Sequence, residues 1–311
     1  MRHRHLELIL DLTSRCNIRC TMCCFSSTDL LRFRPYDVEP GANGDMSGAV
    51  FRTIASDLLP LTHTLGLGCS AEPLLHPDFS RWLRTCHGHR VPKIWLQTNL
   101  LALTVANARA IVQNGVHMVA VSIDGTTRQT YEKIRAGASW KRLHSRLDLL
   151  KRVGAAASHP QPELRVTFTW MQSNRDELRS LPRFAASIGA REIDVRFVVP
   201  TEGVDNRDEL LSDVERAELM EELWRVAREA TSRGLRLSAY PAMDAEPGAR
   251  RSVAGKIKHK IWLITSGIQG VDSWRRTLYE RLNGCSFPGR LFLIRRGSER
   301  DTRWVVARPV A

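Results

Sequence analysis

The stretch LTSRCNIRCTMCC, residues 12–24, decides the fold and directly follows a short apolar run. It places Cys16, Cys20 and Cys23 in a C-x3-C-x2-C pattern. A structural zinc site uses four protein ligands, and a [4Fe–4S] cluster ligated fully by protein uses four cysteines. Three thiolates in so short a loop therefore indicate a metal centre with one corner left open.

The chain around this loop alternates between apolar runs and amphipathic stretches. Strands are expected at residues 6–12, 64–69, 94–98, 118–123, 164–170 and 193–199, several of them apolar at nearly every position, as buried parallel strands are. Helices are expected at residues 47–59, 78–87, 104–113, 127–135, 140–153 and 175–188. Repeated strand–helix units predict an α/β fold, and about six of them suit a partial (β/α)6 barrel of TIM type better than a closed eight-unit barrel.

Polar motifs follow the second, third and fourth of these strands. They read GLGCSAEPLLHPDF at residues 66–79, QTN at residues 97–99 and SIDG at residues 122–125. In parallel barrels chemistry gathers at the carboxyl ends of the strands, where these motifs stand. Together with the cysteine loop, and in this order, the motifs resemble those of the radical S-adenosylmethionine (radical SAM) superfamily.

The resemblance implies a cofactor set and a reaction. Cys16, Cys20 and Cys23 would bind three irons of a [4Fe–4S] cluster, and S-adenosylmethionine would chelate the fourth. Reductive cleavage of S-adenosylmethionine would give a 5′-deoxyadenosyl radical that abstracts hydrogen from the substrate, with flavodoxin or ferredoxin as the reductant. The implied substrate is a peptide or a small-molecule natural product lying over the open mouth of the barrel.

Five residues outside the loop are candidates for binding S-adenosylmethionine. By the resemblance, Glu72 and Pro73 belong to the segment that receives the methionyl amino group, and Asn99, Ser122 and Asp124 approach the rest of the molecule. Short hydroxyl and carboxylate groups suit ribose hydroxyls. Simpler roles remain open: Glu72 as a solvated carboxylate at a strand end, Asp124 as a helix cap and Asn99 as a turn former. Further along the chain, Gln172 and Arg196 are candidates to reach a carboxylate.

The chain is expected to divide into a radical SAM core at residues 1–200 and a C-terminal part at residues 201–311. The second part begins with a charged helix at residues 213–232 and a strand at residues 235–240. Cys285 opens a pattern similar to a SPASM or twitch extension, but Thr302 stands where its second cysteine belongs, and one cysteine cannot hold a cluster. A degenerate or truncated extension is expected, and the Arg-rich run at residues 290–308 does not look like a strand pair.

Two other functions remain open at this point. The cysteine loop could hold zinc, with Cys24 or a histidine as the fourth ligand, or it could belong to an iron–sulfur protein without catalytic turnover. The formal net charge of +13 also allows a radical enzyme that acts on RNA. However, only 7 of the 46 basic residues are lysines and the arginines are spread along the chain, which argues against a nucleic-acid partner.

Length and composition limit the class of protein. A chain of 311 residues, 43% of them hydrophobic, can bury one large core with a modest appendage. No apolar run reaches the length of about eighteen residues that a membrane span needs. Seven cysteines, an odd number with three clustered and the others scattered, do not look like a disulfide framework, and reduced thiols beside a cluster indicate the cytoplasm.

Overall fold

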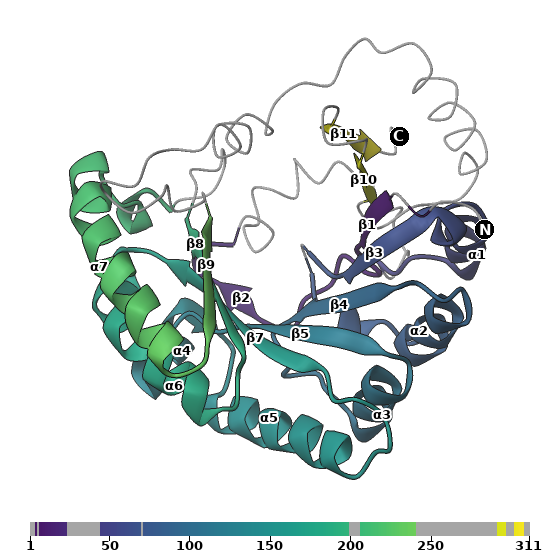
Figure 1. Cartoon of the computed structure of the whole chain (residues 1–311), viewed down its shortest axis with the longest axis horizontal. Coiled ribbons are helices and arrows are strands. Elements are labelled where there is room, and N and C mark those ends of the chain that lie inside the picture. Colours follow the sequence, from purple (N-terminus) through teal and green to yellow (C-terminus); the bar gives the residue numbers. More distant parts are fainter. Residues whose placement is uncertain are drawn as a thin grey trace.

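The computed structural model describes residue 4 and residues 6–23, 44–69, 71–198, 206–240, 291–296 and 302–307. Of these, residues 213–219, 240, 291–296 and 302–307 are described by their backbone alone. Within this part of the chain a nine-stranded sheet has the order β11-β10-β1-β3-β4-β5-β7-β8-β9. The sheet curves strongly, and helices cover its convex side (Figure 1). Since β11 and β9 are not paired with each other, the barrel stays open.

Seven strands of this sheet run parallel. They are β1 (Leu6–Leu10), β3 (Thr62–Leu67), β4 (Lys93–Thr98), β5 (Val116–Ser122), β7 (Glu163–Trp170), β8 (Glu192–Phe197) and β9 (Arg236–Tyr240). The six predicted core strands are confirmed to within two residues at each end. The strand expected at residues 235–240 joins the same sheet as β9, beside β8. The mostly parallel sheet alternating with helices confirms the predicted partial TIM-type barrel.

The helices begin at residues that can cap them. They are α1 (Gly48–Asp57), α2 (Phe79–Gly88), α3 (Val105–Gln113), α4 (Arg128–Ile134), α5 (Trp140–Ala155), α6 (Leu181–Ser187) and α7 (Asp213–Ser232). The side chains of Ser47, Thr104, Thr127 and Ser139 each accept a hydrogen bond from a backbone N–H in the first turn. Such caps satisfy donors that the helix itself leaves unpaired.

The helix expected at residues 175–188 is divided in two. A 3-10 segment, η4 (Gln172–Ser180), comes first, and α6 begins only at Leu181. Pro182 stands in the first turn of α6, where its missing N–H costs nothing. The same residue inside one continuous helix would remove a hydrogen bond, so the chain starts a new helix there. Three short 3-10 turns, η2 (Leu59–Leu61), η3 (Pro73–Leu75) and η5 (Arg207–Glu209), join other elements.

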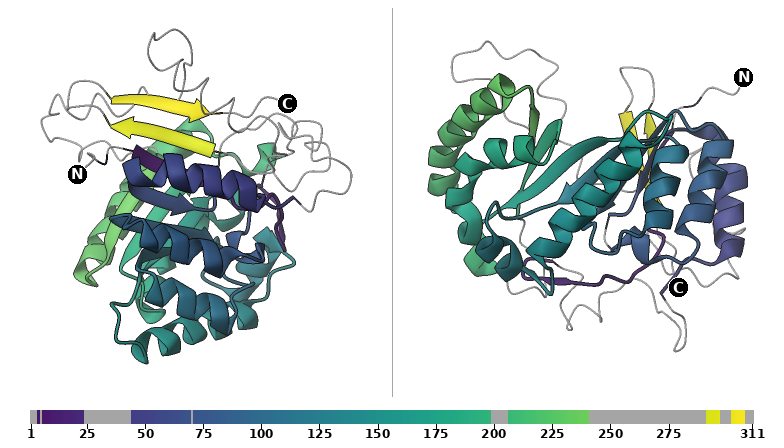
Figure 2. Two further views of the ribbon diagram at one scale, coloured as in Figure 1. Left: turned by 90° about the vertical axis from the view of Figure 1, so that its right-hand side faces the viewer. Right: turned by 90° about the horizontal axis from the view of Figure 1, so that it is seen from below.

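The expectation that residues 290–308 form no strand pair is wrong. β10 (Leu291–Arg296) and β11 (Thr302–Ala307) are antiparallel, and β10 pairs antiparallel with β1. Figure 2 shows the two strands side by side next to the N-terminal strand. Between their arginines the two runs carry Leu, Phe, Ile, Trp and Val, residues that favour strands. Cys24 and Cys285 lie outside the described residues.

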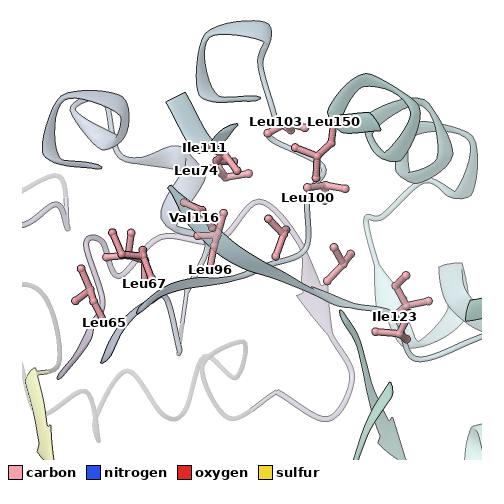
Figure 3. Packing of buried hydrophobic residues seen from close by; sticks show 14 of the residues in the cluster. Leu65, Leu67, Leu74, Leu96, Leu100, Leu103, Ile111, Val116, Ile123 and Leu150 are labelled. Carbon is pink, nitrogen blue, oxygen red and sulfur yellow. The ribbon is translucent and has the colours of Figure 1, made fainter. Parts of the chain in front are cut away.

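The hydrophobic core lies between the convex face of the sheet and the helices. Alternate strand residues such as Leu65, Leu67 and Leu96 belong to one buried cluster with Ile111 of α3 and Leu150 of α5 (Figure 3). Full burial of one such side chain contributes about 1.5–3 kcal/mol. Because strand side chains alternate between faces, the remaining positions lie on the concave face.

Among the helices that the structure describes, none combines the length and the apolar character that crossing a lipid bilayer requires.

Candidate functional site

The cysteine loop leaves the carboxyl end of β1 and is fixed by backbone hydrogen bonds. Ser14 N donates to the Gly44 carbonyl over 2.7 Å, and Glu72 N donates to the Arg15 carbonyl over 2.9 Å. At its far end, β2 (Arg19–Cys20) pairs antiparallel with β6 (Arg135–Ala136). The loop is therefore attached to the segments that follow β3 and α4, which holds its thiols in place.

All three thiols of the loop are half-buried, and two of them receive polar partners. Asn99 Nδ2 lies 3.7 Å from Cys16 Sγ, and Arg135 Nη1 lies 3.7 Å from Cys20 Sγ, both positioned to donate. Burial raises the pKa of the Cys16 thiol and raises the pKa of Cys20 to about 12, although Arg135 opposes the shift at Cys20. Donors aimed at two sulfurs suit thiolates that bind a metal centre.

The three thiols of the loop are soft ligands of the kind that iron–sulfur clusters use. In the described part of the chain, no three or more His, Cys, Asp or Glu side chains converge on a single metal ion. In a [4Fe–4S] cluster each thiolate binds a different iron, so its sulfurs need not converge. The binding of such a cluster by Cys16, Cys20 and Cys23 stays a prediction.

Arg135 is the residue beside the loop that the sequence did not reveal. It follows the last residue of α4 and lies opposite Cys20 in the β2–β6 pair. Its guanidinium forms a buried ion pair with Asp124, Nη2 to Oδ2 2.7 Å. Burial by itself would lower the pKa of Arg135, but the combined effect of the neighbouring groups Asp124, Cys20 and Tyr131 raises it. The only signal in the sequence is one arginine at the end of a predicted helix, a common occurrence.

Asp124 is wholly buried and both of its oxygens bind this chain. Oδ2 pairs with Arg135, and Oδ1 accepts a hydrogen bond from Thr169 N over 2.7 Å. The alternative that Asp124 caps the next helix is wrong, because Thr127 is the N-cap of α4. The expected contact between Asp124 and S-adenosylmethionine stays a prediction.

Glu72 joins the segment after β3 to the end of β4. Its Oε1 accepts from Leu74 N and from Thr98 Oγ1, at 3.1 and 2.7 Å, and its Oε2 accepts from Asn99 N at 2.7 Å. Only 1% of Glu72 is exposed, so the alternative of a solvated carboxylate is wrong. Burial raises the pKa of Glu72 to about 7 against these three hydrogen bonds. Pro73, also buried, begins η3.

Asn99 contacts the cysteine loop, whereas Ser122 is bonded to the neighbouring strand β4. Asn99 Nδ2 also donates to Asn17 Oδ1 over 2.9 Å, and Asn99 Oδ1 accepts from Leu101 N, which confirms the turn-forming role. Ser122 Oγ accepts from Gln97 Nε2 over 2.6 Å on the concave face. The structure thus gathers Asn99, Arg135 and Asp124 around the loop, while the contact that it gives for Ser122 is with β4.

Residues 10–159 match the model of the radical SAM superfamily. The matched segment, just under half of the chain, is a radical SAM domain. Radical SAM enzymes use a [4Fe–4S] cluster and S-adenosylmethionine, which agrees with the ligand set of the loop. The matched residues include the cysteine loop and the motifs after β3, β4 and β5.

Relatives of the radical SAM domain include enzymes with different substrates. The chain is 27% identical over 199 residues to the tungsten-containing aldehyde ferredoxin oxidoreductase cofactor-modifying protein of Pyrococcus furiosus, covering 62% of this chain and 51% of that protein. It is 26% identical over 203 residues to the AdoMet-dependent heme synthase of Methanosarcina barkeri, covering 64% and 52%. The chain therefore spans about half the length of these curated relatives.

The fold also matches solved structures. Streptococcus suis SuiB bound to S-adenosylmethionine superposes with a TM-score of 0.60 at 14% sequence identity, covering 80% of this chain and 54% of that chain. At this identity the likeness concerns the fold alone. It supports the open barrel as the scaffold of the radical SAM domain.

Proposed function

We propose that this protein is a radical SAM enzyme in which Cys16, Cys20 and Cys23 bind three irons of a [4Fe–4S] cluster. The supporting observation is the loop of three half-buried thiols, with Asn99 and Arg135 directed at two of the sulfurs, inside a radical SAM domain. When bound, the cluster supplies the electron that cleaves S-adenosylmethionine to a 5′-deoxyadenosyl radical, which abstracts hydrogen from the substrate. The division of the chain near residue 200 remains part of the same proposal.

The residues around the loop stabilise negative charge on its sulfurs. The Asn99 amide and the Arg135 guanidinium both donate towards a thiolate, and a hydrogen bond from a charged donor is stronger than one from a neutral donor. Asp124 balances the charge of Arg135 and fixes its direction. Glu72 accepts a hydrogen bond from Asn99 N and thereby fixes the backbone that carries the Asn99 amide.

For S-adenosylmethionine we assign Glu72, Pro73, Asn99, Ser122 and Asp124. Glu72 and Asp124 act by position, because their oxygens are already bonded to the chain and they fix the segments that border the loop. Ser122 Oγ accepts from Gln97, which leaves its hydroxyl hydrogen to donate to a ribose oxygen.

The substrate we assign is a peptide or a small-molecule natural product bound at the concave face. A neighbour in fold, SuiB, has been solved bound to the precursor peptide SuiA, with a TM-score of 0.57 at 14% identity. A flavodoxin or ferredoxin would deliver the electron. Because the loop thiols must stay reduced to bind iron, we place the protein in the cytoplasm.

The test is anaerobic reconstitution of the full chain with iron and sulfide. We expect about four irons per chain, the visible absorbance of an iron–sulfur centre, and 5′-deoxyadenosine when dithionite and S-adenosylmethionine are added. Replacing Cys16, Cys20 or Cys23 by Ala should abolish both the cluster and the product. The matched control is Cys86→Ala, which removes a buried thiol from α2 and should leave the iron content unchanged.

Two results would contradict this function. One zinc per chain without an iron–sulfur absorbance would identify a zinc-binding protein. A full iron complement without any 5′-deoxyadenosine would identify an iron–sulfur protein that lacks turnover.

A further inference from the structure

A row of polar side chains crosses the concave face of the sheet. Ser122 of β5, Thr167 of β7, Asp194 of β8 and Ser238 of β9 stand directly opposite one another on neighbouring parallel strands. Gln97 of β4 joins the row by its hydrogen bond to Ser122 Oγ. Figure 1 shows these five strands lining the inner side of the curved sheet. We call these five residues the inner-face row.

The alternation of the strands fixes which face the row occupies. Val121, Val166 and Ile193 precede members of the row and are fully buried in the core against the helices. The next residue on each strand therefore points to the opposite, concave side. The interior of a parallel barrel is usually filled with branched apolar side chains. A row of hydroxyl, carboxylate and amide groups there needs another explanation.

Two buried atoms of the row have no hydrogen-bond partner in the part of the chain that the structure describes. Thr167 is 4% exposed, and within the described residues neither its Oγ1 nor Gln97 Oε1 has a hydrogen-bond partner. Buried polar atoms are nearly always paired, and each exception calls for a reason. A ligand on the concave face would pair both atoms, since the hydroxyl can donate or accept and the amide oxygen accepts.

Arg196 supplies the charge next to this row. It stands two residues after Asp194 on β8, on the same face, with 44% of its side chain exposed. Its Nε and Nη2 both lie 2.9 Å from Asp194 Oδ2, and Asp194 Oδ1 accepts from Ser238 Oγ over 3.2 Å. Asp194 is thus occupied on both oxygens and holds the guanidinium in one orientation. Within the described residues, Nη1 of Arg196 is left without an acceptor.

We propose that Thr167, Asp194, Arg196 and Ser238, the β7–β9 patch, form the substrate-anchoring subsite, and that Arg196 binds an anionic oxygen group of the substrate, a carboxylate or a phosphate. A planar guanidinium whose orientation is fixed by Asp194 is well suited to bind such groups. Asp194 and Ser238 are positioning residues, and Thr167 contacts the substrate directly. This inference rests on the proposed function, because Ser122, assigned to S-adenosylmethionine, adjoins the patch in the same row.

The test measures anion binding to the cluster-loaded full chain, kept anaerobic at constant ionic strength. The probes are inorganic phosphate, N-acetylglutamate amide and its neutral counterpart N-acetylglutamine amide. Each dissociation constant is obtained from the rise of the thermal unfolding midpoint with probe concentration. We expect one of the two anions to bind in preference to the neutral amide, and whichever binds tells whether the natural group is a carboxylate or a phosphate.

Arg196→Gln should weaken binding of that anion by about tenfold or more, since one hydrogen bond to a charged group is lost. Affinity for S-adenosylmethionine, measured by calorimetry, should stay the same. Arg196→Lys should recover part of the anion binding. The matched control is Arg179→Gln, which removes the same charge from an exposed ion pair with Glu222 on the helical side and should change nothing.

Thr167→Val gives a second readout that does not depend on charge. Removing a buried hydroxyl without a partner should leave the unfolding midpoint of the probe-free protein unchanged or raise it. The same change should weaken binding of the anion. A variant that binds the anion as the parent does would remove Thr167 from the subsite.

Several results would overturn the inference. Equal anion binding by the parent and Arg196→Gln would do so, as would the absence of saturable binding of either anion. A loss of S-adenosylmethionine affinity in Arg196→Gln would assign that residue to the cosubstrate instead. If the parent forms 5′-deoxyadenosine but binds no anion, only this inference fails. If the parent holds no cluster, the proposed function fails first.

Discussion

Single residues near the cysteine loop combine burial with charge. Arg135, Asp124 and Glu72 are all buried, and each has its charged group bonded to another part of the chain. Charges of this kind stabilise a fold only while their partners remain. The residue scale therefore offers the sharpest tests of how the site is held.

Arg135→Leu should destabilise the protein strongly. The change leaves the Asp124 carboxylate buried without its partner, which costs about 3–5 kcal/mol in comparable pairs. Urea unfolding of the metal-free protein measures the loss. Arg128→Leu, which breaks an exposed pair with Glu132, is the control and should have little effect. Similar losses in the two variants would contradict the importance of burial here.

Glu72 should make stability depend on pH. Burial raises its pKa from the ordinary 4.5 to about 7, so the folded state holds a proton that the unfolded state has released. The parent should therefore lose stability relative to Glu72→Gln as pH rises from 4.5 to 7, by about 3 kcal/mol in total, and the difference should then level off. Unfolding free energies of both proteins across this range test the sign. A difference that grows in the opposite direction would show that the hydrogen bonds outweigh burial.

The cysteines of the site could be predicted from the sequence, but the partners of their sulfurs could not. Three cysteines at short spacing predict a metal centre, because their number and spacing suit metal ligands. Arg135 is 115 residues from Cys20 along the chain, and no local pattern connects them. The burial of Glu72 likewise depends on Thr98 and Asn99, which reach it only after β3 and β4 have paired.

At the scale of elements, the turn after β3 requires a glycine at position 68 for two reasons. Gly68 has a positive φ of +84°, and a Cβ there would lie 2.7 Å from the Gln97 carbonyl oxygen and 2.8 Å from the Pro73 ring. Gly68 N also donates a hydrogen bond to the Leu10 carbonyl, which links the turn to β1. Only glycine satisfies both the backbone angle and the close approach.

Gly68→Ala should cost more stability than Gly189→Ala. Gly189 also has a positive φ, +78°, but a Cβ there would meet nothing within 4 Å. Gly189→Ala should therefore lose only the backbone term, about 1–2 kcal/mol, while Gly68→Ala adds a clash with backbone. Thermal unfolding of the two variants gives the comparison. Equal losses would mean that the turn after β3 adapts at no cost.

The sequence predicted some strands and helices better than others. The apolar runs of β3, β4 and β5 predicted strands because of their length and their apolar residues, many of which are buried. The break between η4 and α6 follows from Pro182, although the helical pattern continues across it. β10 and β11 were missed because their arginines mask a strand pattern, and because β10 pairs with β1, far away in the sequence.

At the scale of the whole molecule, the order of the strands separates interior from edge. β4, β5 and β7 lie in the middle of the sheet, each with a strand on both sides, whereas β9 is at one end. Hydrogen exchange should therefore be slowest in β5 and its neighbours and faster in β9. Mass spectrometry of exchanged peptides tests this order. Protection of β9 equal to that of β5 would indicate that another segment covers this edge.

The sequence by itself determined the class of fold, the cysteine loop and the place of the motifs at the ends of β1, β3, β4 and β5. It could do so because hydrophobic periodicity and ligand spacing are local properties of the chain. Only the tertiary structure decided that Arg135 faces Cys20 and that the buried Glu72 carboxylate links the segment after β3 to the end of β4. It also decided that the inner-face row lies on one surface. These features depend on the register between strands distant in sequence, which is set when the sheet assembles and its apolar face is buried.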